Sequence, residues 1–115
     1  MLSKKNRISK KEFPHILNSG KKYNSVSLML YVALGSNKEK KQSRFSFSVS
    51  KKIEKMAVKR NKLRRQGYSI IDRHIKQIKG VNLFFFVFKK GSNYVTFNDL
   101  EKEVLGLLSV SSMLT

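Results

Sequence analysis

An unbroken apolar run from Leu83 to Phe88 constrains the fold more than any other feature of this sequence. The run is far shorter than the roughly 20 residues that a membrane-spanning helix needs. No polar residue falls on either face, which predicts a central β-strand buried on both sides. Burial is the favoured interpretation of its aromatic rings, although an RNA-stacking platform is an alternative. These rings belong to Phe84, Phe85, Phe86 and Phe88.

Two further segments alternate between apolar and polar residues, as half-buried strands do. In residues 25–34 one face carries Leu28 and Leu30, and the other carries Tyr31 with small residues. Residues 44–50 place Phe45, Phe47 and Val49 opposite Arg44 and the serines. We predict that these two strands pair directly, in antiparallel orientation.

Three helices are expected around these strands. Ser9 and Glu12 form a capping-box pattern that starts a helix of about ten residues, within which Pro14 should remove a hydrogen bond. A long helix over about 56–78 has a continuous apolar stripe that includes Gly67 and His74. Thr96 caps a third helix, whose first turns hold Asp99, Glu101 and Glu103.

The order α-β-β-α-β-α predicts an α+β fold, a two-layer α/β sandwich built on a small mixed sheet. With 115 residues the chain is one domain. We expect residues 1–8 to form a flexible basic arm and residues 109–115 to form a frayed tail.

Composition excludes several kinds of site. The chain has no cysteine, so it has no disulfide, thiolate metal site or cysteine nucleophile. His15 and His74 are the two imidazoles, and the stripe position of His74 predicts a hydrogen-bonded core residue. The N-terminus lacks the apolar segment of a secretory signal, which favours a soluble cytoplasmic protein without a membrane partner.

The formal net charge of +18 is typical of a protein that binds a polyanion. This charge is uneven. Residues 51–65 are densely basic, whereas the segment from Lys89 to the C-terminus is neutral. The binding partner is therefore expected to contact the first two-thirds of the chain.

Cations gather at the start of the long helix, where the helix dipole disfavours each by about 0.3–1 kcal/mol. A solvated charged face would account for Lys62 and Arg65, but not for clustering at this end. An anion docked there would convert the penalty into a gain, which favours nucleic-acid phosphate. Asn61 could also read a 2′-hydroxyl or a base edge. The cations are Lys55, Lys59, Arg60, Lys62, Arg64 and Arg65.

Two segments carry a family resemblance. Ser48-Val49-Ser50-Lys51-Lys52 is followed by a helix containing Ala57-Val58-Lys59-Arg60-Asn61-Lys62-Leu63-Arg64-Arg65. This combination resembles the signature of the protein subunit of bacterial ribonuclease P, and the likeness extends over about residues 7–110. The family's Arg-Asn-Arg is Arg60-Asn61-Lys62 here, and its usual Gly-Asn before the helix is Lys55-Met56.

The resemblance implies a protein cofactor in an endoribonuclease whose catalyst is RNA. That RNA uses Mg²⁺ to remove the 5′ leader of precursor tRNA, and the protein supplies neither a catalytic residue nor a metal ligand. The implied partners are one ribonuclease P RNA and precursor tRNA, with no small-molecule substrate. The family fold also implies a left-handed β-α-β crossover at the long helix, against the usual right-handed rule.

By position, the resemblance assigns two sets of residues. A cleft for the leader is lined by Phe13, Leu17 and Tyr31, of which Phe13 and Leu17 also suit a core role. The RNA-binding set is Lys51, Lys52, Lys59, Arg60, Asn61, Lys62, Arg64 and Arg65.

Two other functions are possible from the sequence. A structural RNA-binding protein of the small ribosomal type would share the size and the charge, but would not need a cleft at Tyr31. A protein-only nuclease is disfavoured, because the acids Asp99, Glu101 and Glu103 lie too far around a helix to hold one metal ion. Their expected role is to stabilise the start of that helix.

Overall fold

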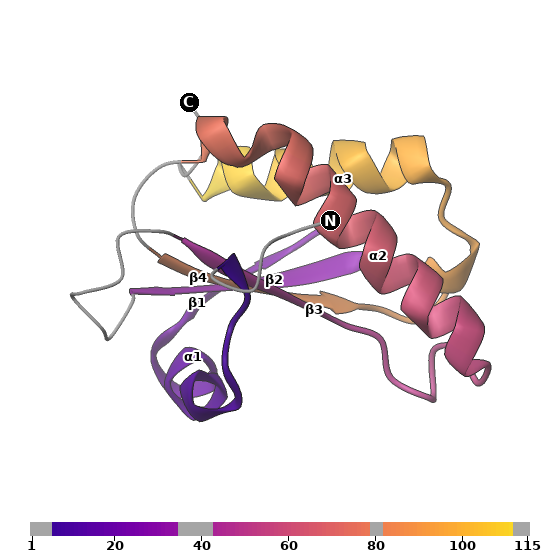
Figure 1. The fold of residues 1–115 in the computed structure, drawn as a ribbon, viewed down its shortest axis with the longest axis horizontal. Coiled ribbons are helices and arrows are strands. Elements are labelled where there is room, and N and C mark those ends of the chain that lie inside the picture. The colour runs from indigo at the N-terminus through magenta and orange to yellow at the C-terminus, as the bar shows by residue number, and fades with distance from the viewer. Residues whose placement is uncertain (1–5, 35–42, 79–81, 112–115) are drawn as a thin grey trace.

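The computed structural model describes residues 6–34, 43–78 and 82–111. Within these residues the chain forms one four-stranded sheet with three α-helices (Figure 1), which is the predicted α+β fold class. The strands are β1 (Lys21–Asn24), β2 (Leu28–Leu34), β3 (Arg44–Ser48) and β4 (Asn82–Phe88). The α-helices are α1 (Phe13–Ser19), α2 (Ala57–His74) and α3 (Phe97–Val110). Short 3-10 turns are η2 (Lys10–Glu12), η3 (Ile75–Gln77) and η4 (Ser92–Tyr94).

The strand order is β1-β2-β4-β3. The predicted direct pairing of β2 with β3 is wrong, because β4 lies between them. It pairs antiparallel with β2 and parallel with β3. Strand β1 was not predicted, because its residues Lys21–Asn24 lack an apolar alternation; it pairs antiparallel with β2 at the edge of the sheet.

Helices cover the two faces of the sheet unequally (Figure 1). Helix α2 connects the parallel neighbours β3 and β4, and it lies with α3 on one face. Helix α1 crosses part of the opposite face and forms a partial third layer. The sheet therefore has one closed face and one partly open face.

The closed face holds the main core. The predicted α2 stripe is buried at Leu63, Gly67, Ile70 and Ile71. Beneath it the ring of Phe47 stacks on Phe86 with centroids 4.7 Å apart, and a parallel stack joins Phe45 to Phe84.

The prediction that β4 is buried on both sides is wrong at two positions on the face toward α1, although Leu83 on that face is buried. Phe84, Phe86 and Phe88 are buried against α2 and α3, but Phe85 and Val87 are only half-buried. Helix α1 has seven residues, too few to cover the whole opposite face. It shields the end of the sheet near Ala33 and Leu83.

The start of α1 differs from the prediction in one respect. The capping box is present, and the Ser9 backbone N–H donates to Glu12 Oε1 at 3.1 Å. However, the α-helix begins at Phe13, so Pro14 stands in its first turn. Backbone N–H groups there have no helical acceptor, and the predicted loss of a hydrogen bond does not occur.

The structure describes the inner ends of the predicted arm and tail. The N–H of Ile8 donates to the carbonyl of Phe45 at 3.1 Å, and Arg7 forms a parallel bridge with the same residue. At the other end α3 continues to Val110, and the N–H of Ser111 donates to Leu107 at 3.0 Å. Residues 1–5 and 112–115 of the predicted arm and tail lie outside the described residues.

The acids of α3 do more than stabilise the start of the helix. The N–H of Asp99 donates to the Thr96 hydroxyl at 3.2 Å, as the predicted cap requires. Glu101 lies 3.2 Å from Arg73 and 3.1 Å from His74, which joins α3 to α2. His74 thus has the expected hydrogen bond, but it is half-buried and does not belong to the core. Glu103 accepts from the backbone N–H of Ser27 at 2.7 Å, and thereby holds the β1–β2 turn.

We predict that Gly67→Ala destabilises the protein, because an added Cβ would lie 2.5–2.8 Å from ring atoms of the buried Phe47. Overpacking of this kind costs about 1–3 kcal/mol, more than the gain of about 1 kcal/mol in helix propensity. The matched control is Gly106→Ala in α3, where nothing lies within 4 Å of the new Cβ, and which should stabilise. Urea unfolding of both variants checks this, and equal stabilisation would show that α2 does not press on Phe47.

Candidate nucleic-acid interface

The Ser-Lys-Lys segment is a tight turn between the end of β3 and the start of α2. Backbone N–H groups of Ile53 and Glu54 donate to the carbonyl of Ser50 at 3.1 and 3.2 Å. Lys51 and Lys52 lie on the outside of this turn and are exposed. The turn therefore presents two ammonium groups beside the first turn of α2.

Helix α2 begins without a side-chain cap. Its N-cap residue, Met56, offers no hydrogen-bonding group, and the nearest acid is Glu54, whose Oε1 accepts from the Met56 N–H at 3.3 Å. No acid stands in the first turn itself. The positive end of the helix dipole thus coincides with a dense group of cations and is compensated by one carboxylate.

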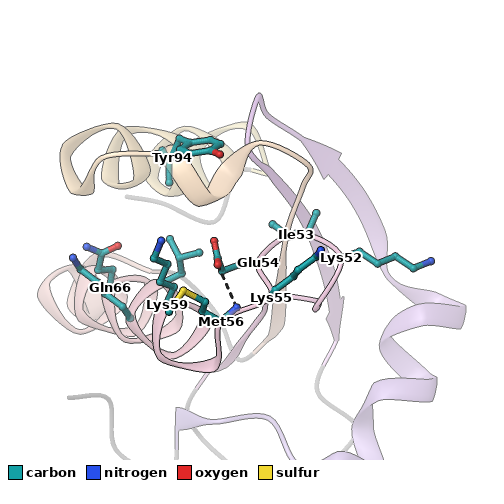
Figure 2. Close-up of a pocket in the computed structure, with 11 residues that line it drawn as sticks. Lys52, Ile53, Glu54, Lys55, Met56, Lys59, Gln66 and Tyr94 are labelled. Carbon is teal, nitrogen blue, oxygen red and sulfur yellow. Dashed lines mark hydrogen bonds between the residues drawn. The ribbon is translucent and has the colours of Figure 1, made fainter.

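Cations of α2 lie on two flanks of the helix. The lysine flank lies toward η4 and lines a hollow of about 620 Å³ (Figure 2). Its basic residues are Lys52, Lys55, Lys59 and Lys62. The arginine flank lies on the other side and lines a second hollow of about 470 Å³, between Asn61, Arg64, Arg65, Tyr68 and Arg7.

Two predicted RNA-binding side chains are held by neighbouring groups in the protein. Arg60 donates to the backbone carbonyls of Glu54 and Lys55 at 3.0 and 2.8 Å, and so braces the loop before α2. Arg64 donates to the Asn61 side-chain oxygen one turn earlier. Lys59, Lys62 and Arg65 project from the same turns and are exposed.

Sequence reasoning missed Arg7 and Tyr68. The Arg7 guanidinium lies over the Tyr68 ring, 5.1 Å from its centroid, which places an N-terminal cation beside the arginine flank. The Tyr68 hydroxyl also lies 3.4 Å from the N–H of Phe47 on the edge strand. The sequence did contain a signal for Tyr68, because residues three and seven positions apart share a helix face. Tyr68 follows Arg65 by three positions and Asn61 by seven.

The open face of the sheet carries an aromatic patch, which we define as Phe13, Tyr31 and Phe85. Strand register places Tyr31 opposite Phe85, and their rings stack with centroids 6.0 Å apart. Phe13 of α1 packs edge-on against Phe85 at 4.9 Å. All three side chains are half-buried, so part of each ring remains accessible. Lys22 adds a charge 5.8 Å from the centroid of Tyr31.

The aromatic patch corrects two expectations. Phe85 was predicted to be buried, but it joins Phe13 to Tyr31 because even and odd residues of β4 point to opposite faces. Leu17 suited a core role, yet its side chain is 54% exposed on the outer side of α1, away from the core residue Ile16.

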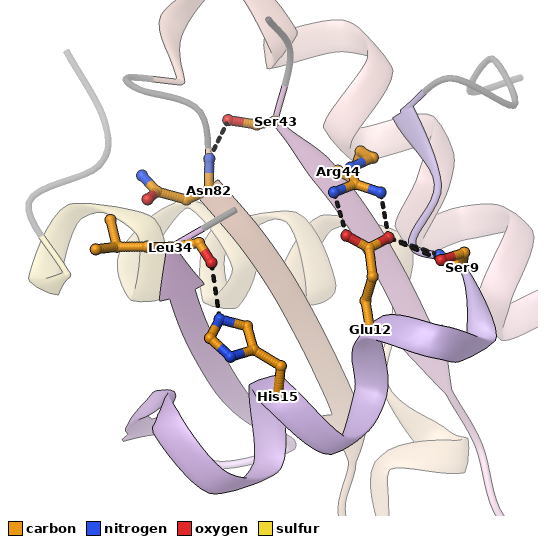
Figure 3. A network of polar contacts seen from close by, with 7 residues as sticks. All are labelled: Ser9, Glu12, His15, Leu34, Ser43, Arg44 and Asn82. Atoms are coloured by element: carbon orange, nitrogen blue, oxygen red, sulfur yellow. Dashed lines mark hydrogen bonds and ion pairs between the residues drawn. The ribbon is translucent and has the colours of Figure 1, made fainter. Parts of the chain in front are cut away.

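Helix α1 is fixed over this face by a buried ion pair. Glu12 accepts from the Arg44 guanidinium on β3 and from the Ser9 hydroxyl (Figure 3), and both ionised residues are more than nine-tenths buried. His15 adds a contact from α1 to the carbonyl of Leu34 at 3.0 Å (Figure 3). Burial by itself raises the pKa of Glu12, but the hydrogen bonds from Ser9 and the charge of Arg44 outweigh it and lower that pKa.

Comparison with known proteins identifies the family of this chain. The family model of ribonuclease P matches residues 2–111. The chain belongs to the ribonuclease P protein family. A ribonuclease P protein component from Clostridium botulinum is 36% identical over 110 residues, covering 91% of this chain and 93% of the relative. One from Syntrophomonas wolfei is 30% identical, covering 98% and 92%.

A solved structure supports the fold independently. The ribonuclease P protein of Staphylococcus aureus superposes with a TM-score of 0.85 at 22% identity, covering 96% of this chain and 98% of that one. Membership of the ribonuclease P family favours the ribonuclease interpretation over a small ribosomal protein. It makes this chain a protein component of an endoribonuclease that acts in tRNA processing with an RNA partner.

Within the described ranges, the chain shows neither a membrane-spanning helix nor a metal cluster. No helix there is both long and apolar enough to cross a bilayer. No group of three or more His, Asp or Glu side chains is placed to hold a metal ion among those residues. The acids Glu101 and Glu103 are instead engaged by the contacts described above.

We predict that Glu12→Gln lowers the free energy of unfolding at neutral pH by about 3 kcal/mol, because it leaves the Arg44 charge buried without its counter-ion. Because the pKa of Glu12 is lower in the folded protein than its ordinary value of 4.5, the ionised carboxylate stabilises the fold at pH values above 4.5. This stability is lost as the pH falls through the folded-state pKa. The difference between the wild type and Glu12→Gln should therefore shrink in acid. Denaturant unfolding at pH 7 and pH 3 measures it, and a constant difference would contradict the ion-pair account.

Proposed function

We propose that this chain is the RNA-binding cofactor of a ribonuclease P holoenzyme, in which one copy binds the catalytic RNA and the 5′ leader of precursor tRNA. The protein would promote removal of the leader by the RNA in the cytoplasm. The observation that carries this proposal is the pairing of two different surfaces: a cationic helix end for phosphates and a partly open aromatic patch for bases.

The start of α2 suits a structured RNA. Its exposed cations flank an uncapped helix N-terminus, so the backbone N–H groups and the side chains favour the same ligand charge. Arginine can grip two phosphate oxygens, whereas lysine supplies a point charge. The residues proposed to contact RNA are Lys51, Lys52, Lys59, Arg60, Asn61, Lys62, Arg64 and Arg65, and we add Arg7 from its place in the arginine flank.

The aromatic patch suits a single-stranded leader. Rings of Tyr31 and Phe13 would stack on unpaired bases, at about 1–3 kcal/mol per base and without a demand for one sequence. We propose that Leu17, exposed on α1, borders the leader together with Phe13. Half-exposed Ser46 and Ser48 on β3 face the same way as Phe85 and could bond to sugar or phosphate oxygens.

A continuous path joins the two surfaces. Strand β3 carries Ser48 on the open face and leads directly into the turn with Lys51 and Lys52, after which α2 begins. An RNA strand on the open face would thus reach the basic turn at the end of β3. Mg²⁺ in this proposal is held by the catalytic RNA and supplies the metal chemistry of cleavage, while this chain binds and orients the leader.

We predict that Tyr31→Ala lowers the affinity of the reconstituted holoenzyme for precursor tRNA by about 5- to 100-fold, the equivalent of one lost stacked base. Affinity for mature tRNA, which has no leader, should not change. Equilibrium binding of both tRNAs measures the ratio.

The matched control is Arg65→Gln on the arginine flank. It should weaken binding of the free catalytic RNA and reduce its salt dependence by about one unit, while leaving the precursor-to-mature ratio unchanged. Equal losses for both tRNAs with Tyr31→Ala would contradict a leader site at the aromatic patch.

A further inference from the structure

Tyr94 is an aromatic side chain that neither the core nor the proposed leader patch uses. Its side chain is 85% exposed, whereas every other phenylalanine and tyrosine of the chain is buried or half-buried. Exposure of a large ring in water is unfavourable, because its apolar surface gains from burial about 25 cal/mol per Å². The position therefore calls for an explanation.

The exposure of Tyr94 does not come from a loose backbone. Gly91 adopts φ 88° and opens η4, in which the N–H of Tyr94 donates to Gly91 at 3.3 Å and that of Val95 donates to Ser92 at 3.1 Å. Ser92 is fully buried, and Val95 packs against the main core. The turn is anchored on both sides of Tyr94, so hydrogen bonds and burial fix the backbone from which the ring projects.

Tyr94 stands beside the hollow on the lysine flank of α2 (Figure 2). Four lysines line that hollow against the one acid Glu54, and Met56 and Ile53 add apolar surface. A hollow of about 620 Å³ is large enough for a nucleotide, and its positive lining complements a phosphate.

We propose that this hollow binds an unpaired nucleotide of the catalytic RNA, with the base stacked on Tyr94 and the adjoining phosphates on Lys59 and Lys62. The inference rests on the proposed function, which it deepens by giving the two flanks of α2 different tasks. The arginine flank binds phosphates of paired RNA, and the lysine flank recognises a bulged or looped nucleotide. Stacking with phosphate contacts selects an unpaired conformation and tolerates any base.

The chain lacks tryptophan, which allows a direct optical test. Tyr94→Trp places a single indole at the hollow, and stacking on a base should quench its fluorescence when ribonuclease P RNA is added. Val110→Trp, at an exposed position near the end of α3, is the control and should keep its fluorescence.

Affinity for the same RNA tests the energetic contribution. Tyr94→Ala should weaken binding at least about fivefold, whereas Tyr94→Phe keeps the ring and should bind within about twofold of the wild type. Lys59→Gln should reduce the salt dependence of binding by about one unit, and the exposed Lys76→Gln in η3 should not.

The outcomes separate this inference from the function on which it rests. Normal RNA binding by the unchanged protein, with no quenching at Tyr94→Trp and no loss with Tyr94→Ala, overturns the lysine-flank site alone. Failure of the unchanged protein to bind the RNA overturns the proposed function. Quenching that grows with protein concentration in the absence of RNA would assign Tyr94 to a contact between copies of the chain, and would also overturn the inference.

Discussion

The central position of β4 is the constraint on which both candidate surfaces depend. Because β4 pairs antiparallel with β2 and parallel with β3, the chain must cross from the end of β3 to the start of β4, and α2 makes that crossing. The apolar stripe of α2 seals one face of the sheet. Its basic first turns are thereby placed directly after β3, while the short α1 leaves part of the opposite face open.

Two close contacts hold the helices that carry these surfaces. Gly67 lets α2 approach the ring of Phe47, and the buried pair of Glu12 with Arg44 fixes α1 to β3. Helix α3 ties α2 in place through Glu101. The cations are consequently concentrated on a rigid helix end, where their mutual repulsion and the helix dipole are unfavourable until an anion binds.

Periodicity predicted the parts of the fold that bury one clear face. The stripe of α2, the Thr96 cap of α3 and the inward residues of β2 are where the sequence indicates. Pairing between distant strands was not predictable in this way, and so β2 was wrongly placed beside β3. The aromatic patch was not predicted for the same reason. Only the register of β4 on β2 shows that Phe85 lies opposite Tyr31.

Residues whose environment depends on α1 were the other failures. Arg44 alternates with Ser46 and Ser48 as a solvent-facing residue would, yet it is 3% exposed because Glu12 lies against it. Leu17 lies outward although it is apolar. The sequence places cations in the first turns of α2, but counting charges does not show that they line two hollows on two flanks of the helix. The most direct test of the central claim is cleavage of precursor tRNA by a bacterial ribonuclease P RNA at low Mg²⁺, with and without this protein. The account predicts that a roughly stoichiometric amount of the protein restores cleavage, and that a basic ribosomal protein does not. No restoration by the folded protein with the RNA of its own species would contradict the account.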